Sequence, residues 1–351
     1  MKRVVIVGCG AVAYRWYFKG IQESDYCRAV ALVDPDERAL KKAGKYLAIK
    51  NIYTSIDHFF NSGIKADIAL VLTPHSSHYN VVKKCLLNNL NVYCEKPFAE
   101  NRFEGRELVE LAKLKNLKLA AAPQIKLSSR NKAVKSLLES EVIGKVALVR
   151  ASGSNMGPAD RVDTNYNPKW FYNDGGSLAS LGIYTLTLIN YLFGKPKRVA
   201  SFSGIAFENR TVKYGPNKGE DFTVTAPDNQ IAILDYGEGM YVLFDGSYVV
   251  KNPVEYELTI HGEKGTILVG GFGGPESIVL IDSEGNHFVG PDDDCHINWN
   301  LFWGVEDLAK CLEESGKLIV DGESALDVIE IMDAMKKSNN QNKIFSFELE
   351  E

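Results

Sequence analysis

The chain has 351 residues, a formal net charge of −5 and 45% hydrophobic residues. Its length favours two domains, because a single hydrophobic core stops growing at roughly 250 to 300 residues. The composition excludes a disordered or fibrous chain. An acidic chain without a block of Lys and Arg offers little to nucleic acid or to an anionic membrane surface. A small molecule is therefore the expected partner.

The N-terminal residues and the apolar runs indicate where in the cell the protein is expected, and the cysteine spacing indicates whether it binds a metal. A strand is expected at residues 3–5, directly after Met1, which leaves no room for a secretory leader. No apolar run approaches the roughly 18 residues that span a bilayer, so we expect a cytoplasmic protein. The cysteines lack C-x-x-C spacing and are expected to be reduced, with no metal bound. The acidic stretch 292–296 is better explained as a solvated loop than as a metal site, since its ligands would be sequence neighbours.

Up to about residue 122, short β-branched runs alternate with amphipathic segments of helical length. The strand-like runs are residues 4–7, 29–33, 68–72, 92–94 and 118–121, and the helix-like segments include 35–47, 76–87 and 102–114. This alternation is typical of repeated βαβ units with both faces of a parallel sheet covered. It predicts a doubly wound Rossmann domain over residues 1–122.

The pattern changes in the remainder of the chain. Strands with glycine-rich turns are expected at 231–236, 240–244, 255–261 and 266–269, and helices at 131–139, near 175–192, at 303–314 and at 324–336. We expect an α+β domain over residues 123–351, in which a large, mainly antiparallel sheet packs on helices. The C-terminal helices could pack back on the first domain.

The first expected strand leads into a glycine turn and then a helix. The turn reads Gly8-x-Gly10-x-x-Ala13, with Ala11 and Val12 between the last two. Gly8 permits the tight turn, and Gly10 lets the backbone approach a pyrophosphate. Ala13 keeps the helix close to the sheet, so that the helix N-terminus faces the phosphates. The turn predicts a dinucleotide cofactor.

Asp34 ends the next strand, about 20 residues after the turn, where an acidic residue is expected to bind the adenosine ribose. A carboxylate there repels a 2′-phosphate, and positions 35 and 36 hold no cation to offset it. NAD is therefore favoured over NADP. Arg38 lies one helical turn further on and keeps NADP open as the alternative.

Two further strands end in polar sequences, TPHSSH at 73–78 and EKP at 95–97. In an open parallel sheet the ligand lies outside the carboxyl ends of the strands, so both segments should border the nicotinamide half of the cofactor. The residues expected to contact the cofactor there are Thr73, Pro74, His75, His78, Glu95 and Lys96.

These motifs resemble the Gfo/Idh/MocA oxidoreductase family. The resemblance continues in LLESEVIGKV at 137–146 and GGSLASLGIY at 175–184, and it weakens from about residue 200. It implies an NAD(P)-dependent enzyme that interconverts a secondary alcohol and a ketone on a sugar, cyclitol or related polyol. In the family the lysine of EKP, here Lys96, holds the reacting oxygen. A compact cation there would stabilise developing alkoxide charge.

The helix expected near 175–192 carries a polar stripe at steps of three and four, made by Ser177, Ser180, Tyr184 and Thr187. Many family members have Asp at the place of Ser180 and a proton-transferring His at that of Tyr184. The resemblance to the branch with glucose-fructose oxidoreductase and dimeric dihydrodiol dehydrogenase implies that the Tyr184 phenol takes this role. A nearby ammonium would lower the pKa of the phenol. The alternative is a tyrosine in the core, and Ser180, which cannot act as a carboxylate, leaves the substrate open.

Further substrate contacts are expected from Lys126, which falls where family members often have Arg, and from Arg161 and Trp170 before the helix. Surface and packing roles are the alternative for the last two. The resemblance also implies a homodimer or homotetramer formed through the open face of the second-domain sheet. Two other functions stay open: an NAD-dependent glycosidase that oxidises its substrate transiently, and a non-catalytic regulator that senses NAD(P) or a sugar.

Overall fold

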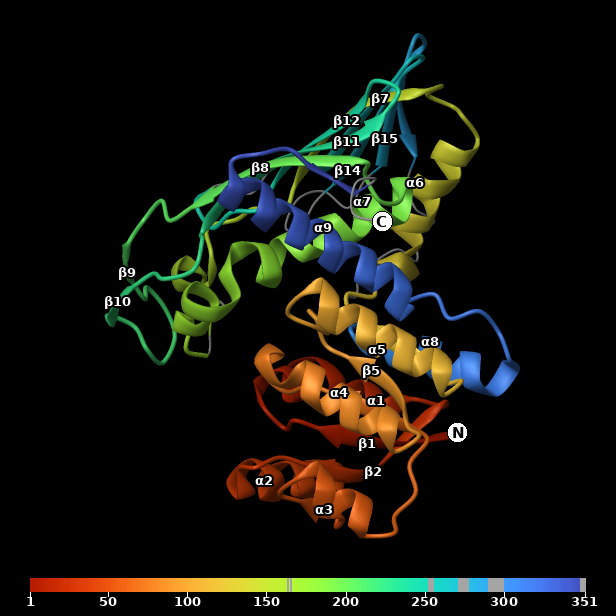
Figure 1. Cartoon of the computed structure of the whole chain (residues 1–351), viewed down its shortest axis with the longest axis vertical. Helices are drawn as coiled ribbons and strands as arrows, with labels where there is room; N and C mark the ends of the chain where they lie inside the picture. The colour runs from red at the N-terminus through yellow and green to blue at the C-terminus, as the bar shows by residue number, and fades with distance from the viewer. Residues whose placement is uncertain (163, 165, 252–255, 271–277, 290–299, 348–351) are drawn as a thin grey trace. The chain divides into compact units, whose positions relative to one another are not determined.

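The computed structural model describes residues 1–162, 164, 166–251, 256–270, 278–289 and 300–347 (Figure 1). Contacts between Cα atoms divide the chain into two compact units. Unit 1 comprises Met1–Leu127 and Trp299–Ile329, and unit 2 comprises Ser128–Asn298 and Glu330–Glu351. The division falls within helix α9 (Gly322–Gln341). No helix in the described ranges combines the length and the apolar character needed to cross a membrane.

Unit 1 is built on a parallel sheet with the strand order β3-β2-β1-β4-β5-β6. Every neighbouring pair in it is parallel. The strands are β1 (Lys2–Val7), β2 (Cys27–Val33), β3 (Ile52–Tyr53), β4 (Ile68–Val71), β5 (Asn91–Cys94) and β6 (Leu119–Ala121). The order reverses between β1 and β4, where a doubly wound sheet binds its ligand. The predicted Rossmann sheet is confirmed.

Helices cover both faces of this sheet. Alternate β1 residues enter two separate cores, Val4 and Ile6 on one face and Val5 and Val7 on the other. The helices of unit 1 are α1 (Phe18–Glu23), α2 (Glu37–Leu47), α3 (Ile56–Asn61), α4 (His78–Leu87), α5 (Arg102–Leu114) and α8 (Trp303–Glu314). Helix α8 shares the core of α1 and α2, while α4 and α5 share the other. The buried strands are therefore apolar on both sides, as parallel strands must be.

Unit 2 contains a large sheet with the order β16-β15-β14-β13-β7-β12-β11-β8-β17. Its pairs are antiparallel except for β12 with β7. The strands are β7 (Val146–Ser152), β8 (Arg198–Gly204), β11 (Asn229–Gly237), β12 (Met240–Asp245), β13 (Tyr256–Gly262), β14 (Thr266–Gly270), β15 (Ile278–Asp282), β16 (Gly285–Val289) and β17 (Phe345–Ser346). The mainly antiparallel sheet predicted for the second domain is confirmed.

One face of this sheet is buried against helices, as Figure 1 shows for α7 (Ile183–Phe193) and for the C-terminal part of α9. Ser338 and Asn339 of α9 accept backbone N–H groups of β8, each at 3.0 Å. Helix α6 (Ser129–Glu139) is also in unit 2. A separate small hairpin pairs β9 (Asn209–Thr211) with β10 (Asp221–Thr223).

The helix expected near 175–192 is not regular over that length. Two π-helical turns, η5 (Phe171–Gly175) and η6 (Leu178–Gly182), precede α7, which begins at Ile183. Gly176 separates the two turns with a φ of +63°, a backbone conformation that favours glycine. The chain is thus helical from Ser177, the N-cap of η6, to Phe193, as predicted, but the first turn of this helix is π-helical instead of α-helical.

Candidate active site

The glycine turn has the backbone geometry that its sequence predicts. Gly8 has a φ of +99°, and a Cβ there would lie 2.7 Å from the carbonyl carbon and oxygen of Leu72, so no other residue fits. A Cβ at Gly10 would meet nothing within 4 Å, which leaves the backbone open to an approaching group. Ala13 is fully buried. The first helix then begins with a π-helical turn, η1 (Ala13–Tyr17), before α1.

Asp34 joins the end of β2 to this turn. One carboxylate oxygen accepts the Cys9 backbone N–H at 2.7 Å, and the other accepts the Asp36 N–H at 2.9 Å. Each oxygen has a second lone pair with which it could accept a ribose hydroxyl. Asp36 is engaged as the N-cap of α2, where it accepts the Arg38 N–H at 2.8 Å. The acidic end of β2 is thus fixed beside the glycine turn.

The segment after β4 approaches the segment after β5 through His78. The ring of His78 is buried, with Nδ1 2.7 Å from the Pro97 carbonyl oxygen and Nε2 2.7 Å from the Thr73 carbonyl oxygen. Burial lowers the pKa of the imidazole, and the two carbonyls oppose this. Because both ring nitrogens face the backbone, we propose that His78 supports the two loops instead of contacting the cofactor.

The remaining residues of this segment lie nearer the surface. Pro74 is exposed, and His75 Nε2 is 3.6 Å from Glu100 Oε1. The Thr73 hydroxyl oxygen is buried and has no hydrogen-bond partner among the described residues. These three residues stay predicted cofactor contacts.

Glu95 and Lys96 directly follow β5, and the Glu95 N–H continues the ladder to the Val71 carbonyl at 3.0 Å. The Glu95 carboxylate is buried, accepting the Tyr17 hydroxyl at 2.7 Å and the Lys96 N–H at 2.9 Å. Lys96 is half-buried and precedes a cis peptide bond to Pro97. Burial lowers the pKa of the Lys96 ammonium to about 8, against the opposing charge of Glu95. The lysine can therefore exist in both forms near neutral pH.

Lys126 is held by its own unit. Its ammonium contacts the Ser324 hydroxyl and lies 3.8 Å from Asp321 Oδ2, at the beginning of α9. The residue is only 7% exposed. Lys126 stays a predicted substrate contact, and we propose that it also has a structural role, in which it stabilises the start of this helix. Sequence position alone could not show this, because the partners lie nearly 200 residues away.

In unit 2, Ser180 lies against a tyrosine that the sequence did not mark. Its hydroxyl donates to the Gly176 carbonyl at 2.6 Å and also contacts the Tyr248 hydroxyl. A Cβ at Gly175 would lie 3.4 Å from Trp170 Cη2 and 4.0 Å from Ser180 Cβ, so Trp170 is a neighbour of Ser180. A serine hydroxyl carries one proton. Since Ser180 gives that proton to Gly176, the phenol of Tyr248 is the donor between the two hydroxyls.

Tyr248 connects the remaining predicted residues of unit 2. Burial raises the pKa of its phenol well above the usual range, with contributions from Tyr172, Tyr166 and Tyr184, while Arg161 opposes them. Arg161 and Tyr184 are thus close enough to Tyr248 to act on it electrostatically. Tyr184 is half-buried at the second position of α7. In unit 2, therefore, Ser180 contacts the buried Tyr248, Trp170 lies near Ser180, and Arg161 and Tyr184 act on Tyr248 electrostatically.

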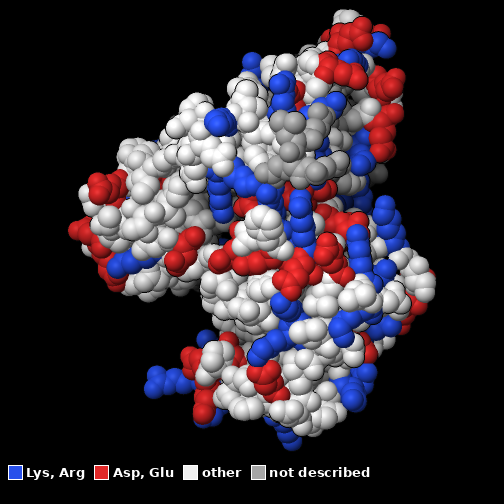
Figure 2. Space-filling view, viewed as in Figure 1, with Lys and Arg blue, Asp and Glu red and all other residues white. Residues whose placement is uncertain are grey.

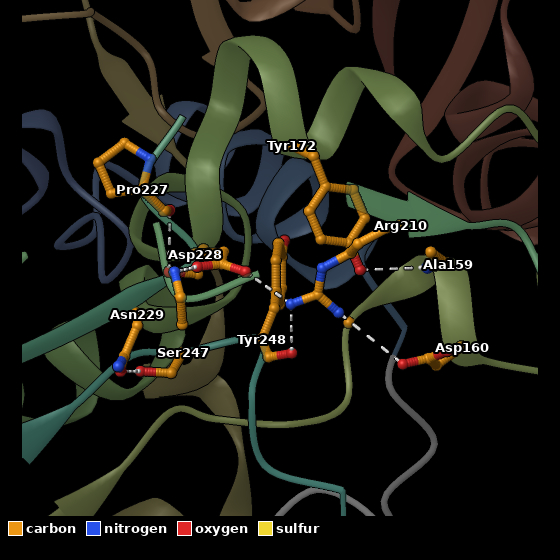
Figure 3. A network of polar contacts seen from close by, with 12 residues as sticks. Ala159, Asp160, Tyr172, Arg210, Pro227, Asp228, Asn229, Ser247 and Tyr248 are labelled. Carbon is orange, nitrogen blue, oxygen red and sulfur yellow. Dashed lines mark hydrogen bonds and ion pairs between the residues drawn. The ribbon is translucent and has the colours of Figure 1, made fainter. Parts of the chain in front are cut away.

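A polar network holds Tyr248 in place (Figure 3). Its N–H donates to the Asp228 carbonyl at 2.7 Å, and its carbonyl accepts from Arg210 Nη2 at 3.1 Å. Arg210 also pairs with the Asp228 carboxylate at 2.6 Å and lies over the Tyr172 ring, 4.9 Å from its centroid. The Tyr172 and Tyr248 ring centroids are 5.1 Å apart. These contacts fix the phenol against Ser180.

Comparison with known families decides the identity of the chain. Residues 2–122 match the model described as an oxidoreductase family with an NAD-binding Rossmann fold, and residues 131–268 match the GFO/IDH/MocA C-terminal domain. The chain belongs to the Gfo/Idh/MocA oxidoreductase family. Unit 1 accordingly carries an NAD-binding Rossmann domain.

Two curated members of the Gfo/Idh/MocA family illustrate the relationship. The chain is 28% identical over 241 residues to trans-1,2-dihydrobenzene-1,2-diol dehydrogenase of Bos taurus, covering 68% of this chain and 64% of that protein. It is 22% identical over 312 residues to scyllo-inositol 2-dehydrogenase (NADP(+)) of Bacillus subtilis, covering 80% and 79%. With the bovine relative, the match thus spans less than two thirds of the relative's length.

Solved structures show the same fold. An oxidoreductase from Agrobacterium radiobacter in complex with NAD+, L-tartaric acid and magnesium has a TM-score of 0.82 at 19% identity, covering 98% of both chains. An aldose-aldose oxidoreductase from Caulobacter crescentus complexed with glycerol has a TM-score of 0.80 at 21% identity, covering 99% of both.

The site residues of this Gfo/Idh/MocA chain suit a dinucleotide and show no metal cluster in the ranges described. The open backbone at Gly10 and the carboxylate of Asp34 have the chemistry that a pyrophosphate and a ribose require. Within the described part of the chain, no three His, Cys, Asp or Glu side chains are grouped to hold a metal ion. The acidic stretch 292–296 lies outside the described residues.

Proposed function

We propose that the protein is a dehydrogenase/reductase that uses NAD, with NADP as the second choice, to interconvert a secondary alcohol and a ketone on a sugar, cyclitol or related polyol. The observation that carries the proposal is the placement of Lys96, half-buried at the carboxyl end of β5 in an NAD-binding domain. The names of the relatives, which act on a dihydrodiol and on scyllo-inositol, support this substrate class.

Lys96 and Tyr184 divide the chemistry in this proposal. The partly desolvated Lys96 ammonium donates to the substrate oxygen and stabilises its negative charge as the alkoxide develops. The Tyr184 phenol gives a proton to that oxygen in reduction and removes one in oxidation. The nicotinamide, when bound, supplies or takes up the hydride at the substrate carbon. Both side chains must therefore reach one oxygen.

The charged surface is compatible with a small neutral substrate. Figure 2 shows acidic and basic side chains interspersed on the face drawn, without a broad area of one sign. Such a distribution gives no long-range attraction for a polyanion. We propose a small-molecule partner and a cytoplasmic location.

A substrate panel separates the three possible functions. Polyols and keto-sugars are assayed with NAD(H) and NADP(H) by the absorbance of the reduced nicotinamide. A dehydrogenase shows saturable net turnover, with NAD preferred because of Asp34. An NAD-dependent glycosidase would cleave glycosides without net NADH, and a sensing regulator would bind without turnover. Either of these two results would contradict the proposal.

The lowered pKa of Lys96 predicts a pH profile. In ketone reduction the charged ammonium is the useful form, so kcat/KM should be constant below a pH of about 8. Above that value it should fall about tenfold per pH unit as the ammonium loses its proton. The variant Lys96→Arg keeps its charge, and its residual activity should lose this limb of the profile. A wild-type profile that stays flat to about pH 10 would contradict the role of the ammonium.

We also propose that the enzyme is a homodimer or homotetramer formed through the outer face of the unit 2 sheet. Large apolar side chains alternate along β8, β11 and β12, and they are exposed: Phe202, Ile231, Ile233, Tyr241 and Leu243. Ile231 pairs with Phe202 and Ile233 pairs with Leu243 across the strands, so the patch is continuous. A contiguous apolar patch on a sheet face favours burial against a partner.

Charged substitutions test this interface. The double variant Ile233→Lys/Leu243→Lys should convert the oligomer to a monomer, because opposed like charges would have to be buried. Light scattering coupled to gel filtration measures the mass. Phe103→Lys, which changes an exposed apolar residue of unit 1, serves as the control and should leave the mass unchanged. A monomeric wild type, or an oligomer that survives the double substitution, would contradict the proposal.

A further inference from the structure

A buried phenol and a buried carboxylate meet next to Lys96. The Tyr17 hydroxyl donates to Glu95 Oε1 at 2.7 Å, and Glu95 Oε2 accepts the Lys96 backbone N–H at 2.9 Å. Tyr17 is fully buried and Glu95 is 8% exposed. The carboxylate thus links the first helix of unit 1 to the residue that is proposed to hold the reacting oxygen.

The position of Tyr17 follows from the start of that helix. The glycine turn ends at Ala13, where the π-helical turn η1 begins, and Tyr17 is the last residue of η1. A π-helical turn holds an extra residue and changes which side chains face the sheet. The Tyr17 ring lies inside, with its centroid 6.2 Å from that of Tyr93 on β5, while the neighbouring Trp16 is exposed.

This contact matters because the Glu95 carboxyl group is buried. A carboxylate removed from water depends on hydrogen bonds to its charged form. Glu95 receives one such bond from Tyr17 and one from the Lys96 backbone. The charge of Glu95 in turn opposes the effect of burial on the pKa of Lys96. A group that hydrogen-bonds to the Glu95 carboxylate is therefore expected to affect the pKa of the Lys96 ammonium as well.

We propose that Tyr17 is a positioning residue for Lys96, acting through Glu95, and that it couples the helix of the glycine turn to the side chain that holds the substrate oxygen. The inference rests on the proposed function of Lys96. It assigns to the first helix a second task besides facing the cofactor phosphates. Sequence motifs do not mark Tyr17, because its partner lies 78 residues away.

Several titratable groups surround this pair. Those that interact electrostatically with Glu95 are Tyr17, Lys96, Cys94 and His78, and those that interact with Tyr17 are Glu95 and Tyr93. Burial raises the pKa of both Tyr17 and Cys94 well above their usual ranges, so both are neutral at physiological pH. Burial also lowers the pKa of His78, so Lys96 is the neighbour of Glu95 whose charge can change near neutral pH.

The test measures the pKa of Lys96 directly and needs no substrate. The full-length protein is labelled with acetic anhydride over a pH series, and acetylation of Lys96 is quantified by mass spectrometry. The variants are Tyr17→Phe, Glu95→Gln and the two combined. Tyr14→Phe is the matched control: it lies in the same π-helical turn, and its buried hydroxyl has no hydrogen-bond partner among the described residues.

Removal of the Glu95 charge should lower the pKa of Lys96, because that charge raises it in the wild type. Tyr17→Phe keeps the ring and should lower the Lys96 pKa as well, by roughly half a pH unit or more, because a buried carboxylate without its donor is less favourable in the charged form. In the Glu95→Gln background, Tyr17→Phe should have no further effect, which is the signature of two residues acting as one. Tyr14→Phe should leave the Lys96 pKa unchanged.

The inference is wrong if Lys96 has the same pKa in Tyr17→Phe as in Tyr14→Phe, or a higher pKa than in the wild type. It is also wrong if Tyr17→Phe shifts the Lys96 pKa by the same amount in the wild-type and Glu95→Gln backgrounds. Cofactor binding to each variant, measured by fluorescence, shows that the fold is kept. A failure of this inference can be distinguished from a failure of the proposed function. If labelling shows the expected coupling while no polyol is turned over, the proposed function fails and the link between Tyr17 and Lys96 stands.

Discussion

Replacing Lys96 with alanine is expected to lower turnover at least about a hundredfold while the affinity for NAD stays nearly the same. The expected size is that of removing one preorganised donor from a developing oxyanion, roughly 10² to 10³ in kcat. Lys96 can supply this stabilisation because it follows β5 at the ligand-binding edge of the sheet and is half-buried beside Glu95. In the proposed site the NAD affinity would depend mainly on the glycine turn and Asp34, which the substitution does not touch.

Steady-state kinetics on the best substrate of the panel measure the change, and calorimetric titration with NAD measures the affinity. Lys50→Ala is a suitable control, because Lys50 is an exposed lysine of the same unit and should tolerate the change. Lys96→Arg should retain part of the activity, since it keeps the charge but not the compact geometry of the ammonium. Near-normal turnover of Lys96→Ala would refute the assignment.

Replacing Tyr184 with phenylalanine is expected to lower turnover by roughly 10² to 10⁴, the usual contribution of a positioned acid or base. The substitution removes one oxygen from a half-buried side chain at the second position of α7 and leaves the ring in place. The loss should therefore appear in kcat and kcat/KM to a similar degree, because proton transfer occurs in the transition state. Protein stability should change little.

Thermal melting checks the stability, and kinetics in both reaction directions check the loss. Tyr214→Phe, a change at an exposed tyrosine of unit 2, should leave turnover unaltered. If Tyr184→Phe retains nearly all of its turnover, the phenol is a packing residue and another group moves the proton.

The sequence was sufficient to predict those strands and turns whose residues follow a regular pattern over a short stretch of the chain. The parallel strands of unit 1 have continuous apolar runs because both faces are buried, and the glycine turn has its own spacing, so β1, β2, β4 and β5 and the turn were all predicted. In unit 2 the strands β11 and β12 were predicted from a different pattern, because buried and exposed residues alternate along them. The helix near 175–192 was also predicted, but the π-helical geometry of its first turn, η6, was not, because the hydrophobic pattern there is that of an ordinary helix.

Only those residues of the candidate site that belong to a recognisable motif could be predicted from the sequence. Asp34, Glu95 and Lys96 follow strands and could be placed at one edge of a sheet. The roles of Tyr17, Lys126 and Tyr248 depend on partners 68 to 198 residues away along the chain. Such contacts leave no local periodicity in the sequence. The ring of His78 was likewise expected at the cofactor, and only its two carbonyl partners show that it faces the backbone.

The central claim is that Lys96 and Tyr184 act on the same oxygen. A crystal structure of the enzyme with NAD and the best substrate of the panel tests it most directly. We predict that Lys96 Nζ and Tyr184 Oη both lie within hydrogen-bond distance of one substrate oxygen, about 2.6 to 3.2 Å. A structure in which the Tyr184 hydroxyl points into unit 2, or in which the two groups bind different substrate atoms, would contradict the mechanism.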